Sequence, residues 1–140
     1  MNIPHSEEEK EEDFLEYLYM GWKSGTEIWP HQVKMHLELM DAELKRLESG
    51  LMESGYLRKR AENSGYRLTE LGKVQGEECL LRHHNLTQFL QMTCGLEEEE
   101  AEENACRMEH VISGNVLQGV QEFLKYGETY DRVVRDVDLR

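Results

Sequence analysis

The sequence of 140 residues has few of the features that build disulfide-rich or membrane-spanning proteins. It holds only three cysteines and two prolines, and no apolar run approaches the ~18 residues of a membrane helix. The N-terminal stretch MNIPHSEEEKEEDF is acidic, whereas a secretion signal begins basic and continues apolar. These absences predict a cytoplasmic protein without membrane contact, whose cysteines are reduced thiols that serve as core residues or ligands.

Basic residues are also few, 16 against 29 acidic ones, which gives a net charge of -13 at pH 7. As an average, this charge argues against non-specific attraction to DNA or anionic lipid. The charge is uneven along the chain, because the segment from Lys23 to Lys73 holds nine basic and eight acidic residues. Such asymmetry indicates two regions with different partners or arises by chance.

Apolar residues at helical spacing predict a mainly α-helical chain. A first helix is expected over about residues 8–23, where it ends before the Ser24-Gly25 pair, and Pro30 suits the first turn of a short second helix. A third helix is expected to follow closely. Its apolar face is formed by Met40, Leu44, Leu47 and Leu51.

Two short strands, 56–60 and 66–69, are expected on either side of a polar, glycine-containing turn. Three helices followed by a hairpin is the order of a winged helix-turn-helix, here residues 1–72 with a two-stranded wing. The remainder, residues 73–140, is expected to form an all-helical domain. Its predicted helices span about 69–92, 97–113 and 115–126, and a charged tail adds a further turn or two.

Six side chains with metal-binding chemistry lie on three of these helices. They are Asp13, Glu16, His83, Cys106, Glu109 and His110. The last three stand at i, i+3 and i+4, so a helix places a thiolate, a carboxylate and an imidazole on one face. Each candidate also has an ordinary interpretation, since the acidic pair suits a solvated helix face, His83 a surface position and Cys106 a small apolar core position.

The segment 105–113, ACRMEHVIS, closely resembles the signature of the diphtheria toxin repressor family of iron- and manganese-dependent transcription regulators. Other landmarks appear in order over roughly residues 12–126. EDFLEYLY at 12–19 resembles the family's opening helix, and 58–72 with its Leu-Thr-x-x-Gly motif resembles the wing and the turn after it. Arg82-His83 with Gln88-Phe89-Leu90 resembles the segment that holds a ligand histidine.

The resemblance implies that all six candidates are metal ligands and that a homodimer binds double-stranded operator DNA. The chain ends at Arg140 and is expected to be a short form, without the third, C-terminal domain of longer members. The second half would then be the metal-binding and dimerisation domain. Leu117, Val120, Phe123 and Leu124 are candidates for the dimer contact, and core packing is an equal interpretation of them.

The ligand set is a hybrid of two branches of the family. Asp13 and Glu16 match the manganese-responsive pattern, whereas Cys106 matches the iron-responsive one, and Thr87 stands where the iron branch has a carboxylate of a second site. A thiolate is a softer ligand than a carboxylate. The sequence therefore predicts Fe2+ as the ion, with Mn2+ second and Co2+, Ni2+ or Zn2+ as substitutes.

The DNA-reading residues are less clearly marked. The stretch that corresponds to the recognition helix begins with acidic Asp41 and Glu43, where the family usually has small hydroxyl residues, and acids offer no neutralisation of phosphate. Contacts to DNA are therefore expected from Lys45, Arg46, Ser49, Arg58, Lys59 and Arg60. A solubilising hairpin is the alternative interpretation of the last three.

Three hypotheses of function follow. The first is a metal-activated repressor of metal-uptake genes, and the second is a family member that senses metal but acts through protein partners. The third, a metalloenzyme, is disfavoured because no nucleophile elbow, phosphate loop or HExxH motif accompanies the ligands, and no small organic substrate is expected.

Overall fold

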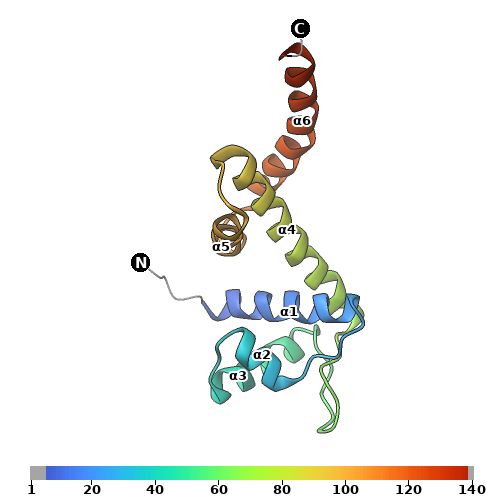
Figure 1. Ribbon diagram of the computed structural model, residues 1–140. Helices are drawn as coiled ribbons and strands as arrows, with labels where there is room; N and C mark the ends of the chain where they lie inside the picture. Colours follow the sequence, from blue (N-terminus) through green and yellow to red (C-terminus); the bar gives the residue numbers. More distant parts are fainter. Residues whose placement is uncertain (1–5, 139–140) are drawn as a thin grey trace. The chain divides into compact units, whose positions relative to one another are not determined.

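The computed structural model describes the chain from Ser6 to Asp138, with side chains up to Tyr126. This part contains six α-helices and no β-strand (Figure 1). The helices are α1 (Glu7–Lys23), α2 (Pro30–His36), α3 (Asp41–Glu53), α4 (Glu70–Cys94), α5 (Glu98–Met108) and α6 (Gly114–Asp138). The mainly helical class is confirmed.

The chain divides into two compact units, the first up to Leu80 and the second from Leu81. The division falls inside α4, which begins in the first unit and continues into the second. The boundary expected between residues 72 and 73 lies at the start of this same helix.

In the first unit, α1 begins and ends at residues that its sequence marks clearly. The Ser6 hydroxyl caps the helix by accepting the Glu9 N–H at 3.2 Å, and Ser24 and Gly25 end it, Gly25 with φ of +73°. The buried face is the predicted one, with Phe14, Leu15, Leu18 and Tyr19 all in the core. The first helix is thus positioned by its apolar stripe.

Helices α2 and α3 are joined by the turn 37–40 and lie on the same side of α1 (Figure 1). A side-chain oxygen at the third position of each helix accepts the backbone N–H just before it, Gln32 from Trp29 at 2.7 Å and Glu43 from Met40 at 3.3 Å. The predicted apolar face of α3 is buried except for Met40, which is 74% exposed. Met40 precedes the helix as its N-cap residue, so its side chain lies off the stripe.

The expected two-stranded wing is not observed. Residues 56–69 form a projecting hairpin-like segment with one antiparallel bridge, Leu57 to Leu68 (Figure 1). Two observations explain why pairing goes no further: the Tyr66 N–H donates to the Ile28 carbonyl, and the Arg60 side chain bonds three carbonyls of the turn at 2.9–3.2 Å. The Tyr66 N–H and the carbonyls that accept from Arg60 therefore do not take part in strand pairing between the two arms of the segment.

The Leu-Thr-x-x-Gly motif has a structural explanation at the start of α4. The Thr69 hydroxyl accepts the Gly72 N–H at 3.0 Å, which caps the helix, and donates to the Gly55 carbonyl at 2.6 Å. A Cβ atom at Gly72 would collide with the Tyr56 carbonyl oxygen. Only glycine permits this close approach of α4 to the start of the hairpin-like segment at Tyr56.

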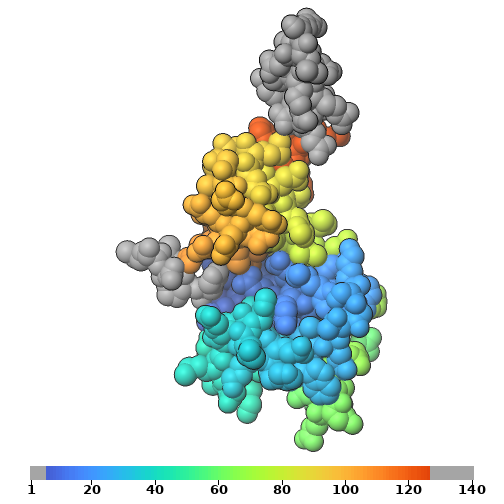
Figure 2. Space-filling view, in the orientation of Figure 1, coloured from blue at the N-terminus to red at the C-terminus, as the bar shows by residue number. Residues whose placement is uncertain are grey.

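The second unit packs the C-terminal half of α4 against α5 and α6. Its buried apolar side chains among the described residues are Leu86, Leu90, Ala101, Ala105, Val120 and Leu124. Two alanines on α5 let the helices approach closely, and the yellow end of α4 and the orange α5 lie side by side in Figure 2. Phe89 and Phe123 meet edge to face at 5.3 Å between ring centroids.

Helix α5 ends at Met108, earlier than the expected residue 113. The Val111 N–H bonds to the Met108 carbonyl in a tight turn, and the Ser113 hydroxyl accepts the Val116 N–H at 3.3 Å at the start of α6. This cap begins a new helix just where the periodicity suggested continuation. The last helix, expected to end near residue 126, instead extends to Asp138.

Candidate metal centre and DNA-binding surface

Three of the predicted ligands lie at the end of α5. Cys106 stands in the last turn of the helix, Glu109 is its C-cap residue and His110 belongs to the turn that follows. The backbone of Glu109 is still helical, and its N–H donates to the Ala105 carbonyl at 2.9 Å. The spacing of i, i+3 and i+4 therefore still places the three side chains together although the helix ends.

The ligand atoms of Cys106, Glu109 and His110 lie within 4.8 Å of one another. His83 approaches the same group from α4, with its Nδ1 3.7 Å from Glu109 Oε1, and His110 Nε2 lies 3.5 Å from that oxygen. Glu109 is 1% exposed as a residue. The structure thus brings four of the six predicted ligands together around one buried carboxylate.

These distances suit a shared cation better than direct hydrogen bonds. Two ligand atoms that each lie about 2.0–2.3 Å from one ion are separated from each other by roughly 3–3.7 Å. A fully buried carboxylate is also costly unless a cation or protonated partner compensates it. The residues present therefore fit a divalent ion held by thiolate, carboxylate and imidazole groups.

Thr87, one turn after His83, does not extend the ligand set. Its hydroxyl donates to the His83 carbonyl at 2.8 Å within α4, and the side chain is buried. This hydrogen bond attaches Thr87 to the backbone of the turn that presents His83. The residue supports the helix at the place where the iron-responsive branch is expected to have a carboxylate.

Asp13 and Glu16 lie one turn apart on α1, in the first unit. Both are partly exposed, while Phe14 and Leu15 between them point into the core. Neither carboxylate therefore belongs to the core of the first unit. That they complete the metal centre stays a prediction.

The acidic residues at the start of α3 are neutralised within the first unit. Asp41 pairs with Lys34 at 2.5 Å and Glu43 with Lys10 at 2.7 Å. The Lys34 ammonium, as hydrogen-bond donor, holds the pKa of Asp41 below its usual value, and the Lys10 ammonium with the Met40 N–H does the same for Glu43. Sequence reasoning missed both lysines, because Lys10 is 33 residues from Glu43 and Lys34 lies on a different helix from Asp41.

The six predicted DNA-contacting residues divide by their present partners. Lys45, Ser49, Arg58 and Lys59 are exposed, whereas Arg46 Nε lies 3.2 Å from Glu7 Oε1. Arg60 uses its Nη1 to donate to the carbonyls of Ala61, Glu62 and Ser64. Arg60 thus holds the turn, and its contact with DNA stays a prediction like those of the other five.

No helix of the described part is long and apolar enough to cross a membrane. Two short helices joined by a turn, a hairpin-like segment and a helical unit that groups candidate metal ligands are features typical of metal-binding helix-turn-helix regulators.

The comparisons with known proteins agree with this class. Residues 69–132 match the family model described as iron dependent repressor, metal binding and dimerisation domain. An uncharacterized HTH-type transcriptional regulator of Methanocaldococcus jannaschii is 28% identical over 81% of this chain and 91% of its own. The HTH-type transcriptional regulator MntR of Oceanobacillus iheyensis is 25% identical over 90% of this chain and 84% of its own.

Solved structures have the same fold. The manganese regulator SloR superposes with a TM-score of 0.73 at 22% identity, covering 83% of this chain, and IdeR of T. acidophilum with 0.66 at 20% identity, covering 91%. The chain spans about half the length of these two structures, 54% and 56%. These likenesses confirm the resemblance to the diphtheria toxin repressor family that the motifs indicated.

Proposed function

We propose that this chain is a cytoplasmic, metal-activated transcriptional repressor that binds operator DNA of metal-uptake genes as a homodimer. The observation that carries the proposal is the convergence of Cys106, Glu109 and His110 with His83 around a buried carboxylate. The matched family consists of transcriptional regulators rather than enzymes. Asp13 and Glu16 on α1 would supply the remaining ligands.

The ion pairs of α1 support a link between metal binding and DNA reading. Lys10 pairs with Glu43 at 2.7 Å, and Glu7 pairs with Arg46 at 3.2 Å, so the helix with two proposed ligands is joined to α3 at two points. A bound ion supplies positive charge that offsets the clustered carboxylates. A shift of α1 on metal binding would therefore be transmitted to the helix that is proposed to read DNA.

The pairing of Asp41 and Glu43 weakens the case for the alternative that acts only through protein partners. That alternative rests on these two acids and on the net charge of -13, and both acids already face lysines. The exposed positions Lys45, Ser49, Arg58 and Lys59 leave hydrogen-bond donors for phosphate. Arg46 would add a further donor once its ion pair with Glu7 is broken.

Part of α6 is proposed as the dimer contact. Val120 and Leu124 belong to the core of the second unit, whereas Phe123 is 43% exposed. Of the four candidates, Phe123 is therefore the best placed for contact with a second copy. Two half-sites of the operator, about one turn of the DNA helix apart, would then match the two-fold symmetry of the dimer.

A mobility-shift assay with DNA from upstream of its own coding region, with and without Fe2+ or Mn2+, tests the function. Wild type is expected to shift the DNA only with metal. Glu109→Gln removes a proposed ligand, so the variant is expected to need more than about 100-fold more metal than wild type to shift the DNA. Losing a residue that only supports a ligand costs up to about that much. Glu103→Gln, an exposed carboxylate on the same helix, is the charge-matched control. Absence of a shift with any metal would refute the repressor.

The choice of metal depends on Cys106. A thiolate favours Fe2+ over Mn2+ relative to a carboxylate, so anaerobic calorimetric titrations of wild type and Cys106→Glu are expected to show a change of preference toward Mn2+. If wild type already prefers Mn2+ and the substitution changes nothing, Cys106 does not select the ion.

A further inference from the structure

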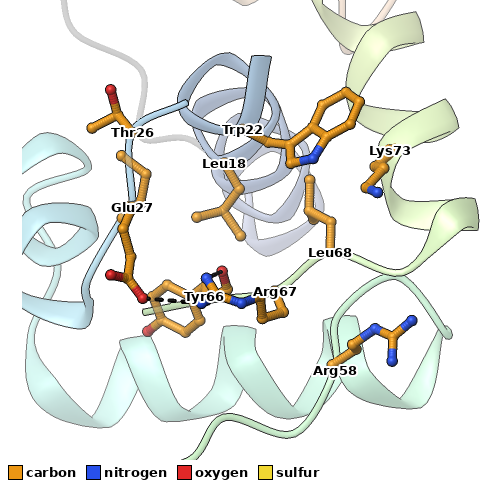
Figure 3. A pocket seen from close by; sticks show the side chains of 10 residues that line it. Leu18, Trp22, Thr26, Glu27, Arg58, Tyr66, Arg67, Leu68 and Lys73 are labelled. Carbon is orange, nitrogen blue, oxygen red and sulfur yellow. Dashed lines mark hydrogen bonds and ion pairs between the residues drawn. The ribbon is translucent and has the colours of Figure 1, made fainter. Parts of the chain in front are cut away.

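The first unit contains a cavity of about 490 Å3 that the proposed function does not use. It lies between the end of α1, the loop to α2, the base of the hairpin-like segment and the start of α4 (Figure 3). Leu18, Ile28 and Leu68 give it apolar walls, and the half-exposed ring of Trp22 lies at its side. The size is within the usual range of about 300–1,000 Å3 for sites of small molecules.

The charged residues of this cavity are mostly cationic. Arg58, Arg67 and Lys73 line it with a single acid, Glu27. Glu27 is already engaged, because its Oε1 accepts the Gly65 N–H at 2.8 Å and lies 3.3 Å from Arg67 Nη2. The lining therefore holds two more cations than anions.

The other two cations differ in their present partners. Lys73 Nζ lies 4.4 Å from the centroid of the Trp22 ring and donates to Glu70 Oε1 at 3.0 Å, so this ammonium is already paired. Within the described residues the Arg58 guanidinium makes no hydrogen bond or ion pair, and Figure 3 shows it on the opposite arm of the segment from Arg67. A guanidinium is a bidentate donor that suits a carboxylate.

We propose that this cavity binds a small organic anion, a carboxylate on an apolar or aromatic body. The carboxylate would be held by Arg58, and the body would lie against Trp22 and Leu68. A neutral apolar molecule would gain nothing from the guanidinium, and an inorganic anion would leave the apolar walls in contact with water. The cavity thus favours a ligand that has both parts.

Binding there would stabilise the first unit specifically. An occupant contacts α1, both arms of the hairpin-like segment and the first turn of α4, all of which belong to that unit. A ligand that binds only the folded unit raises its stability by mass action. The occupant would also restrain the base of the hairpin-like segment, which carries Lys59. This restraint would not involve the proposed metal ligands.

The test uses the full chain with Trp29→Phe, so that Trp22 is the only tryptophan. The probe 4-fluorophenylacetate is titrated and followed by Trp22 emission and by fluorine NMR, against the neutral 4-fluorophenylacetamide and inorganic phosphate. The acid is expected to bind at least about tenfold more tightly than the amide or phosphate. Equal binding of acid and amide, or of acid and phosphate, would overturn the proposal.

Two charge-matched variants locate the binding. Arg58→Gln is expected to weaken binding of the acid by about tenfold or more, and Lys59→Gln, one residue along and outside the cavity, by less than about twofold. Both side chains are exposed, and far-UV circular dichroism verifies that the variants fold. Equal losses in the two variants would show general attraction by charge and would contradict the assigned site.

Discussion

The two units of the chain differ in the side chains that they bury. The first buries thirteen apolar residues in one cluster, including Phe14, Tyr19 and Tyr66. The described part of the second buries six, two of them alanines, and places the carboxylate of Glu109 among its buried side chains. Since a buried charge is costly without compensation, the second unit is expected to depend on a cation and the first is not.

The acidic residues show the same difference. In the first unit Asp41 and Glu43 lie near the surface, each beside a lysine. In the second, Glu109 lies between His83 and His110 at distances longer than hydrogen bonds. Surface pairs add little to stability, whereas a buried group with ligand geometry affects both stability and function.

The largest expected effect is on the core of the first unit. Phe14 is fully buried and meets Tyr66 edge to face at 5.3 Å, so Phe14→Ala is expected to cost about 3–5 kcal/mol. Urea unfolding followed by tryptophan emission measures it, because Trp22 and Trp29 both lie in this unit. Met20→Ala, at a half-exposed position of the same helix, is the control, and an equal loss in both variants would contradict a core centred on Phe14.

Metal is expected to have the next largest effect, and mainly on the second unit. At an ion concentration 100 times the dissociation constant, binding adds about 2.7 kcal/mol to the folded state. Hydrogen exchange is expected to slow in residues 86–90 and 101–105, beside the ligands, more than in residues 44–51 of α3. Equal slowing in both places would remove the distinction between the units.

The sequence predicted the helices well wherever a short stretch of neighbouring residues determines the backbone conformation. The start of α4 near residue 69, the break at Ser24-Gly25 and the buried stripe of α1 were all predicted, since each depends on neighbours in the chain. The family motif likewise marked the group around Glu109.

The features that could not be predicted depend on partners far along the chain. The bond from the Tyr66 N–H to the Ile28 carbonyl, which competes with strand pairing, joins residues that no periodicity relates. The lysines beside Asp41 and Glu43 come from other helices, so the acids at the start of α3 looked exposed to DNA. Tertiary contacts of this kind override local propensity.

A smaller effect is expected from the turn of the hairpin-like segment. Arg60 donates to three carbonyls there, so Arg60→Ala is expected to cost about 1 kcal/mol, while Lys59→Ala leaves stability unchanged. Urea unfolding by tryptophan emission compares them. Equal stability of the two variants would show that the guanidinium does not hold the turn.

The smallest expected effect is the pH dependence of the pair between Lys10 and Glu43. The hydrogen bond from Lys10 and that from the Met40 N–H hold the pKa of Glu43 below its usual 4.5. A carboxyl with a lowered pKa in the folded state stabilises the fold above its unfolded pKa and loses this contribution as the pH falls through its folded pKa. Stability of the first unit is therefore expected to decrease below about pH 4.5, and less so in Glu43→Gln. Urea midpoints by tryptophan emission at several acidic pH values measure this, with Glu53→Gln at the other end of α3 as the control. If Glu43→Gln follows the wild-type pH profile as closely as Glu53→Gln does, the pair contributes nothing, and the surface acids of the first unit only neutralise charge.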